Sequence, residues 1–215
     1  MQLSIEIFGC QDVSGIEGVM RKQDMYFENK TIENIKLEGE VLEEAEFVDC
    51  EFRQCVFENC TLRRCNFKGC TFTNCNIISL KTKHSQSKNT ELSNCNLIGI
   101  HWNELMPAGG IFDTIRKMSG CFLKYNTFMG MRFTKFDFSD NNIQESLFDD
   151  CNLKESNFKG CQLERTQYTN CDMRKADFRD TSGYQIDLLS NQLEGARFSF
   201  PDVVNLLNSI GVRVE

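Results

Sequence analysis

Residues 45–77 read AEFVD CEFRQ CVFEN CTLRR CNFKG CTFTN CNI, and this stretch decides the fold. A cysteine recurs at every fifth position from 50 to 75, and a large apolar residue stands two positions after each one, as Phe52 follows Cys50. A period of five matches neither the 3.6-residue period of an α-helix nor the two-residue period of a strand. It is typical of a chain that turns a corner every five residues, with one large and one small side chain of each repeat pointing inward.

The five-residue period continues on both sides of this stretch. Towards the N-terminus it runs back to Phe27, and a second array covers residues 121–199. The second array lapses at Gly183 and returns at Leu188. Cysteine, serine, threonine or alanine fills most of its small positions, and of the 12 cysteines only Cys10 lies outside the two arrays. The period is therefore a property of most of the chain.

Four five-residue sides would close a square coil of 20 residues, and successive coils would stack about 4.8 Å apart through backbone hydrogen bonds. Each coil buries its inward side chains only against its neighbours, so the fold is stable only as a stack. We therefore predict an all-β protein, a quadrilateral β-solenoid, with residues 25–102 as a first coil stack and residues 121–199 as a second. Residues 78–91 keep the phase and are expected to form an irregular coil whose polar side bulges outward. Residues 1–24 are expected to form an N-terminal cap.

The break between the two stacks differs in length from a coil. Trp102 and Leu123 are 21 residues apart, one more than a coil. Residues 103–120 are therefore predicted to form an exposed loop, within which residues 111–118 could form a short helical turn. This loop either contacts a partner or only repairs the register of the repeat. The residues in it that favour a loop are Pro107, Gly109 and Gly110.

The C-terminus leaves the repeat and reads FPDVVNLLNSIGVRVE over residues 200–215. Pro201 suits the first position of a helix and Gly211 suits the position after its end. We predict a helix followed by a short tail. This helix either covers the open end of the solenoid or joins two copies of the chain. Its apolar stripe consists of Val203, Val204, Leu206, Leu207 and Ile210.

The composition excludes several classes of protein. A net charge of −7 and a pI near 5.0 argue against direct binding of nucleic acid or an anionic membrane through bulk charge. No run of 18 apolar residues is present, so no membrane span is expected. The N-terminal residues lack the pattern of a secretory signal. We expect a cytoplasmic protein whose cysteines remain thiols.

Metal binding and catalysis are the other interpretations of a cysteine-rich chain. A tetrathiolate zinc site would use Cys50, Cys55, Cys60 and Cys65, which occupy the four inward positions of one coil. Serine, threonine and alanine fill the equivalent positions of the second array, so small volume is the property they share, and no metal or cofactor is expected. Inward thiols are too sequestered to act as nucleophiles. The adjacent pair Asp149–Asp150 would lie on a convex surface without a cleft, so we do not expect an enzyme.

The tandem pattern small-x-[Leu/Phe]-x-x resembles that of the pentapeptide repeat family over most of residues 25–199. The ending Phe-Ser-x-Pro…Leu-Leu…Gly-Val-x-Val is similar to that of the branch containing Qnr-type quinolone-resistance proteins and microcin-immunity relatives. The resemblance implies right-handed coils and a rod-shaped homodimer joined through its C-terminal ends. It further implies a mimic of duplex DNA that binds DNA gyrase or topoisomerase IV and relieves poisoning by drugs or toxins. In Qnr-type members, projecting loops matter to that activity.

Outward charges bear on this implied function. Glu43 and Glu44 would lie beside Arg63 and Arg64 of the next coil, and the side that follows Phe133 is largely basic. The side with the aspartates of the second array is expected to carry no cation. The surface is thus charge-mixed, which leaves open a general protein-interaction scaffold as the alternative to a DNA mimic. The candidate partner-binding residues are Asp149, Asp150 and Asp187, with Glu43, Glu44 and Glu46 and the loop residues Pro107, Gly109 and Gly110.

Overall fold

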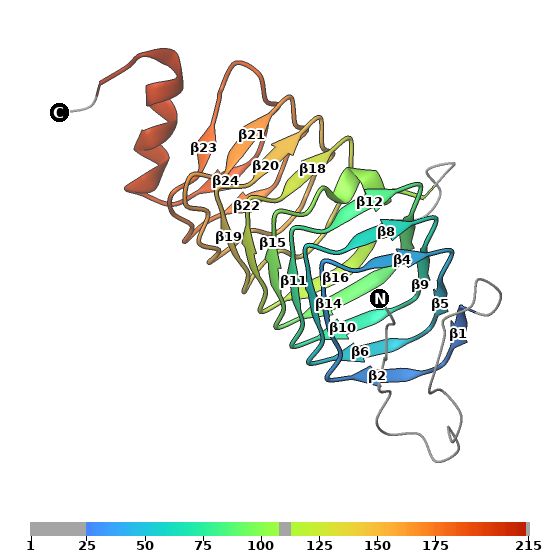
Figure 1. The fold of residues 1–215 in the computed structure, drawn as a ribbon. Helices are drawn as coiled ribbons and strands as arrows, with labels where there is room; N and C mark the ends of the chain where they lie inside the picture. The colour runs from blue at the N-terminus through green and yellow to red at the C-terminus, as the bar shows by residue number, and fades with distance from the viewer. Residues whose placement is uncertain (1–24, 108–112, 214–215) are drawn as a thin grey trace. The chain divides into compact units, whose positions relative to one another are not determined.

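The structure, a computed structural model, describes residues 25–107 and 113–213. The chain divides into two compact units. Unit 1 comprises residues up to 96 together with 104–116, and unit 2 comprises residues 97–103 and those from 117 onward. Within each unit, short parallel strands stack from one coil to the next (Figure 1). The prediction of a quadrilateral β-solenoid is confirmed.

Unit 1 has four sheets, one for each side of the coil, and successive members of a sheet lie one coil apart. The first sheet contains β1 (Tyr26–Glu28), β5 (Glu46–Val48), β9 (Asn66–Lys68) and β13 (Gln86–Lys88), and the second contains β2 (Thr31–Glu33), β6 (Glu51–Arg53), β10 (Thr71–Thr73) and β14 (Thr90–Ser93). The third contains β3 (Lys36–Glu38), β7 (Val56–Glu58) and β11 (Asn76–Ile78), and the fourth contains β4 (Val41–Glu43), β8 (Thr61–Arg63) and β12 (Lys81–Lys83).

Unit 2 repeats this arrangement with shorter strands. On one side, β17 (Phe122–Lys124) pairs with β19 (Asn142–Gln144). The next side contains β18 (Thr127–Met129), β20 (Leu147–Asp149), β21 (Gln167–Thr169) and β23 (Gln185–Ile186). On a further side, β22 (Asp177–Phe178) pairs with β24 (Arg197–Phe198). Isolated parallel bridges complete the remaining sides, such as Arg132 to Asn152 and Asn152 to Asp172. Four further elements are β15 (Asn96–Ile98), β16 (Ile115–Ser119) and two 3₁₀-helices, η1 (Trp102–Leu105) and η2 (Asp202–Ile210).

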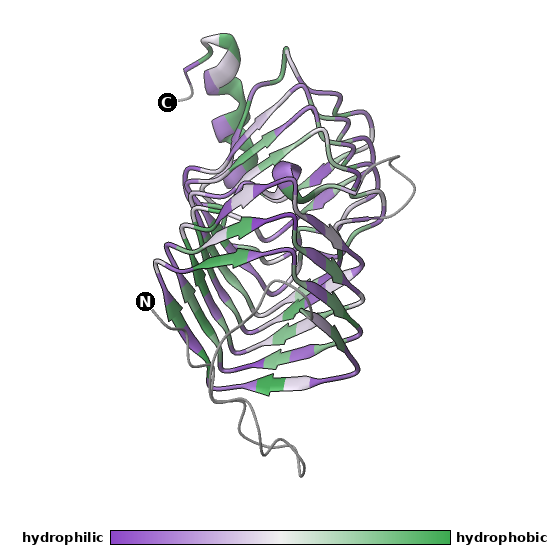
Figure 2. Ribbon diagram, turned by 45° about the vertical axis from the view of Figure 1, so that its right-hand side comes forward, coloured by the Kyte–Doolittle hydropathy of each residue, from purple (hydrophilic) through white to green (hydrophobic). Residues whose placement is uncertain are grey.

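The register is 20 residues per coil, so side chains of one kind form columns along the interior. Phe27, Phe47 and Phe67 stack with ring centroids 5.0 Å apart at each step. In unit 2, Phe158 lies between two parallel rings at 4.5 and 4.6 Å. Figure 2 shows hydrophobic residues along the strands and hydrophilic residues at the corners. The large positions therefore form the core that the period of five predicts.

Most corners carry a residue with positive φ, which recurs every five positions over residues 29–99 and 120–180. Asn29, Asn34, Gly39 and Asp49 have φ between 49° and 69°. Asparagine, aspartate and glycine tolerate this left-handed conformation at the lowest cost. Arg64 adopts it too, with φ 53°. Packing of the inward side chains therefore outweighs the conformational preference of a single corner residue.

The small inward position carries a hydrogen-bonding role that the sequence analysis did not recognise. Cys55 Sγ donates to the carbonyl oxygens of Ile32 and Arg53, 3.3 Å away in each case. Thr166 Oγ1 donates in the same way to the carbonyl oxygen 23 residues earlier, at 2.8 Å. Asn141 does so with its side-chain amide, at 3.1 Å. The position therefore selects for a small donor as well as for volume, although alanine is accepted at Ala45.

The coil at residues 78–91 is more regular than expected. Thr82 pairs with Leu62 and Ser87 with Phe67 in the ordinary 20-residue register. The predicted outward bulge is therefore wrong. Polar side chains occupy the inward positions instead: Ser87 is buried and hydrogen-bonds to Thr90. Thr82 Oγ1 donates to a carboxylate oxygen of Glu104 at 2.6 Å, which satisfies its hydroxyl.

The described part of the predicted loop at 103–120 contains secondary structure. Residues 103–105 belong to η1 and Ile115–Ser119 form β16, so the described residues of the expected helical turn over 111–118 lead into a strand from Ile115. His101 pairs with Thr127, 26 positions later. The coil therefore holds six residues more than 20, and Trp102 stacks on Phe128 rather than above Leu123. Trp102 and Leu123 belong to different columns of the core, so the number of residues between them does not measure the length of this coil.

The lapse at Gly183 is a shortened coil. Tyr168 pairs with Ile186, only 18 residues later. The inward position predicted for Leu188 is therefore taken by Ile186, which is buried, whereas Leu188 is half-buried. Gly183 has φ 77°, and a Cβ there would lie 2.7 Å from Glu164 Cα. The backbones approach too closely for any other residue, which explains why glycine stands at the shortened corner.

The C-terminal helix is a 3₁₀-helix that ends as predicted and begins at Asp202, one residue later than predicted. Pro201 is its N-cap residue and Gly211, with φ 75°, its C-cap residue. The N–H group of Gly211 points to the carbonyl oxygens of Asn208 and Leu207. The predicted N-terminal cap at 1–24 lies outside the described residues, and among those described no helix is long and apolar enough to cross a membrane.

Candidate partner-binding site

The outer surface of β18, β20, β21 and β23, here called the acidic face, carries three of the candidate carboxylates. Asp149 pairs with Thr169 in the next coil, and Asp187 follows Ile186, which takes the register position after Tyr168. The shortened coil therefore places Asp187 in the same column as Asp149, two coils along. Asp150 stands at the adjoining corner with φ 53°.

Two of these three carboxylates have polar partners, and none of the three is paired with a cation among the described residues. Asn170 donates a side-chain hydrogen bond to Asp149 Oδ1 at 3.4 Å, and the N–H of Leu189 donates to Asp187 Oδ1 at 2.9 Å. Asp150 is exposed. In the part of the chain that the structure describes, no ion pair joins any of these three carboxylates to lysine or arginine. Their charges therefore remain available to a partner.

A shallow groove ends the acidic face beside η2. Glu164 and Asp187 contribute carboxylates, and Arg165 lies on the same rim, with its Nε 3.8 Å from Glu164 Oε1. The expectation that this side carries no cation is therefore wrong at the C-terminal end of the face, where Arg165 lies. The amides and hydroxyl that complete the polar lining are Gln167, Gln185, Asn205, Asn208 and Ser209.

The neighbouring side of unit 2 is basic, as predicted, but partly neutralised. Arg174 Nη2 lies 2.6 Å from Asp172 Oδ2, and these hydrogen bonds lower the pKa of Asp172. Lys135 Nζ lies 3.7 Å from Glu155 Oε2. The acidic and basic sides meet at one edge of the coil, so unit 2 has no uniformly negative surface.

Two of the three carboxylates predicted in the first array are paired with an arginine. Arg64 Nη2 lies 2.6 Å from Oε1 of both Glu43 and Glu44, and the pKa of Arg64 is raised mainly by its hydrogen bond to Glu44. Glu46 accepts a hydrogen bond from Asn66 Nδ2 at 3.3 Å. This bridging between coils confirms the compensation expected from the sequence. It also makes Glu43 and Glu44 weak candidates for contacting a partner.

The loop candidates do not form a described surface. Pro107 is buried, so its expected role as an exposed contact is wrong. The carboxylate of Glu104 meets Thr82 in the preceding coil, which anchors the segment just before Pro107. Gly109 and Gly110 lie outside the described residues.

The apolar stripe of η2 is only partly covered by its own chain. Leu206 is buried, whereas Ile210 is 44% exposed. Phe200 and Leu189, beside the helix in sequence or in space, are 82% and 81% exposed. The N–H of Leu188 donates to Ser209 Oγ at 3.2 Å, which attaches η2 to this end of unit 2. Large apolar side chains thus gather at the C-terminal end.

Burial disfavours the thiolate form at two of the inward cysteines. Burial raises the pKa of Cys70 and that of Cys161 to about 12, which disfavours the thiolate that a nucleophile or metal ligand requires. Among residues 25–107 and 113–213, no group of three or more potential ligand side chains is placed to hold a metal ion.

Comparison with known proteins matches these features to one family. A family model described as a pentapeptide repeat region matches residues 121–198, and one described as pentapeptide repeats in nine copies matches residues 32–76. Together they match more than half of the chain. No curated protein sequence matches it.

Solved structures share the fold at low sequence identity. Full-length QnrB1, described as a plasmid-mediated fluoroquinolone resistance protein, aligns with a TM-score of 0.60 and 16% identity, over 87% of this chain and 100% of its own. A trypsin-treated variant of QnrB1 aligns with a TM-score of 0.50 and 16% identity, over 88% of this chain and 98% of its own. The period of five, the stacked square coils and the two family matches agree: this chain belongs to the pentapeptide repeat proteins.

Proposed function

We propose that this chain is a non-enzymatic cytoplasmic binding protein that engages DNA gyrase or topoisomerase IV and relieves poisoning by drugs or toxins. The observation that carries the proposal is the acidic face, where Asp149, Asp150 and Asp187 lack a cationic partner among the described residues. The likeness in fold to QnrB1, described as a fluoroquinolone resistance protein, supports the choice of partner.

The density of charge decides how such binding would work. Duplex DNA carries one negative charge per about 1.7 Å of axis. Three carboxylates spread over three coils, at a spacing of roughly 4.8 Å per coil, amount to about one charge per 3 to 5 Å. The acidic face is thus a sparse mimic of DNA, and recognition would rest on a few placed contacts. Direct binding of nucleic acid is not expected of it.

A homodimer through the C-terminal end is part of the same proposal. Phe200, Leu189 and Ile210 expose apolar surface there, and contiguous exposed apolar patches commonly mark interaction sites. We expect light scattering to give twice the monomer mass at micromolar concentration. A monomer at that concentration would limit η2 to covering its own unit.

The decisive experiment adds the purified full-length chain to gyrase supercoiling reactions with and without a fluoroquinolone. We expect restored supercoiling in the presence of the drug, and binding that weakens steeply as salt rises. The double variant Asp149→Lys and Asp150→Lys should abolish protection, because it reverses the charge at the centre of the acidic face.

A matched control changes the net charge by the same amount elsewhere. Glu40→Lys with Glu58→Lys alters two half-buried carboxylates of unit 1 and should retain protection. Equal loss in both double variants would show that bulk charge, and not the acidic face, is responsible. If neither protection nor inhibition occurs over a wide concentration range with folded protein, the gyrase proposal fails.

The second candidate function is a general protein-interaction scaffold. The mixed charge of unit 2, with Arg174 and Asp172 paired beside the acidic face, favours it over a dedicated mimic of DNA. A scaffold would bind a partner through the same face without altering supercoiling. Retention from host lysate of a partner other than gyrase or topoisomerase IV, its loss in the Asp149→Lys and Asp150→Lys variant, and unchanged supercoiling would favour the scaffold.

A further inference from the structure

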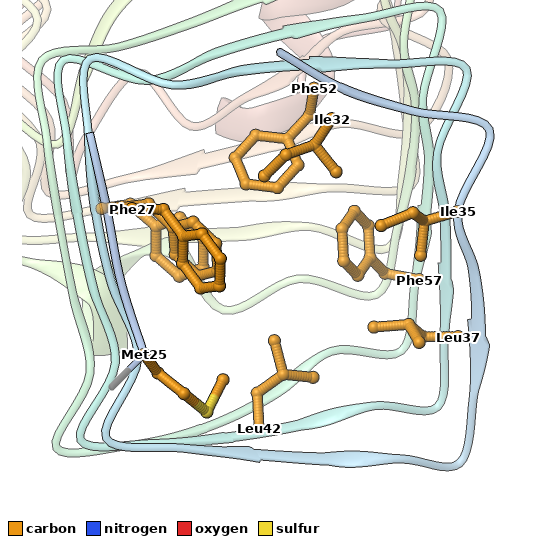
Figure 3. A pocket seen from close by; sticks show the side chains of 10 residues that line it. Met25, Phe27, Ile32, Ile35, Leu37, Leu42, Phe52 and Phe57 are labelled. Carbon is orange, nitrogen blue, oxygen red and sulfur yellow. The ribbon is translucent and has the colours of Figure 1, made fainter. Parts of the chain in front are cut away.

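The first described coil opens onto a wholly apolar pocket in unit 1. Figure 3 shows side chains from all four sides of the coil pointing into it. Among the described residues, no polar side chain contributes to its lining. The residues that line it are Met25, Phe27, Ile32, Ile35, Leu37, Leu42, Phe47, Phe52, Phe57 and Phe67.

The columns of the core end at this pocket. Phe47 is buried between Phe27 and Phe67, whereas Phe27 itself is only half-buried. One face of the Phe27 ring stacks on Phe47 at 5.0 Å, and its other face points out of the stack. Ile35 is half-buried as well. The pocket is therefore the open end of the hydrophobic interior.

The backbone of this coil also presents a strand edge. In the repeat, the N–H that opens each strand donates to the preceding coil, as Glu46 donates to the Met25 oxygen at 2.7 Å and Thr61 to the Glu40 oxygen at 2.8 Å. The equivalent N–H groups of Tyr26 and Val41 point towards the side where a preceding coil would lie. An open edge next to apolar surface is a site for strand addition.

Residues 1–24 are long enough for one more coil but have the wrong pattern for it. Continuing the phase back from Phe27 would place Lys22, Glu17 and Asp12 at three successive inward positions. Burying three charged side chains in an apolar interior without partners is too costly. A regular coil therefore cannot cover the pocket, and a different arrangement is required.

The first residues of the chain have the pattern of a half-buried strand. Gln2 to Ile7 alternate polar and apolar, with Leu3, Ile5 and Ile7 on one face and Ser4 and Glu6 on the other. The 17 residues between Ile7 and Met25 can span about 55 Å at roughly 3.3 Å each. That is several times the width of a coil side, so the strand can reach the pocket from either direction.

We propose that residues 2–7 of the same chain add to the edge of the first coil as a strand, with Leu3, Ile5 and Ile7 filling the apolar pocket. The connection starts at Met25, which itself lines the pocket. The strand would end the stack and block its free edge against addition of another chain.

The test uses the full-length protein with isotope-labelled isoleucine methyl groups. We expect nuclear Overhauser contacts from the methyl groups of Ile5 and Ile7 to the ring of Phe27, within one chain. A sample mixing labelled and unlabelled copies identifies the source of the contacts. Contacts found only between copies would overturn the proposal in favour of a second copy as the occupant.

Paired variants supply the second readout. Ile5→Asp with Ile7→Asp should bind the hydrophobic dye ANS several times more strongly than the wild type and speed amide exchange at Tyr26 and Val41. Ser4→Asp with Glu6→Asp, on the opposite face of the same strand, should change neither. Absence of the methyl contacts in the wild type, or equal effects of the two pairs, would overturn the proposal even if one variant failed to fold.

Discussion

At the scale of single residues, the repeat assigns each inward position one of two tasks. The large position supplies a ring or an aliphatic chain to a column, as Phe158 does between Phe138 and Phe178. The small position supplies a donor to the backbone of the preceding coil, as Cys55 does. Cysteine meets both demands of the small position because it is compact and its thiol donates weakly at little desolvation cost. Packing and backbone pairing therefore account for the abundance of cysteine at this position.

The first prediction concerns the large position. Phe158→Ala should lower the free energy of unfolding by about 3–5 kcal/mol, because it removes a fully buried ring from the middle of a column. Lys159→Ala, the neighbouring exposed residue in a 3.8 Å ion pair with Asp180, should lower it by less than about 0.5 kcal/mol. Urea unfolding monitored by circular dichroism measures both, and similar losses would contradict the inward register.

At the scale of the coil, corners and ion pairs hold neighbouring turns in place. Arg64 bridges to Glu43 and Glu44, and Arg53 to Glu33, in each case across one coil. Such exposed pairs contribute little each. The identity of the corner residues matters more, because most corners require a positive φ that residues other than glycine adopt at a cost. The shortened coil at Gly183 combines positive φ with a close backbone approach.

The second prediction compares two glycines at corners of nearly equal φ. Gly183 and Gly160 have φ of 77° and 76°. Gly160→Ala meets open space and should cost about 1–2 kcal/mol, the cost of a left-handed alanine. Gly183→Ala adds a collision with Glu164 Cα and should cost about 1–3 kcal/mol more. Thermal unfolding of the two variants tests this, and equal midpoints would count against the close approach.

At the scale of the whole molecule, buried thiols are spread through both units and link stability to pH. All 11 described cysteines are buried, and burial raises the pKa of Cys70 and Cys161 to about 12. A thiol whose pKa is raised on folding stabilises the protein fully below its unfolded pKa, near 8.5. That contribution is lost as the pH rises from there towards 12, because the unfolded thiol releases its proton first.

The third prediction follows from this linkage. In the presence of reductant, the contribution of the thiols to the free energy of unfolding should not change with pH up to about pH 8. It should fall between about pH 8.5 and 10. Cys161→Ser should show a shallower fall than the wild type over the same range, because one titrating group is gone. Urea midpoints at four pH values provide the measurement. If the urea midpoints of the two proteins fell equally with pH, the pKa of Cys161 would not be raised by burial.

The architecture could be predicted from the sequence because its cause is local and repeated. A large residue at every fifth position, from Phe27 onward, leaves no other periodic structure that buries them all. The helix bounds near Pro201 and Gly211 were predictable for the same reason, since caps depend on the residues at the ends themselves. The compensation of Glu43 and Glu44 by Arg64 followed from the 20-residue register alone.

The tertiary structure decided what happens wherever that period fails. The chain passes from His101 to Thr127 in a 26-residue coil and from Tyr168 to Ile186 in an 18-residue one, and nothing in either stretch alone states which residue resumes the column. That choice depends on which side chain fits against the coil already in place, as Trp102 does on Phe128. The same shift aligned Asp187 with Asp149 and placed Arg165 on the rim of the groove. Register after a break is set by packing between residues far apart in the chain, which a local pattern does not encode.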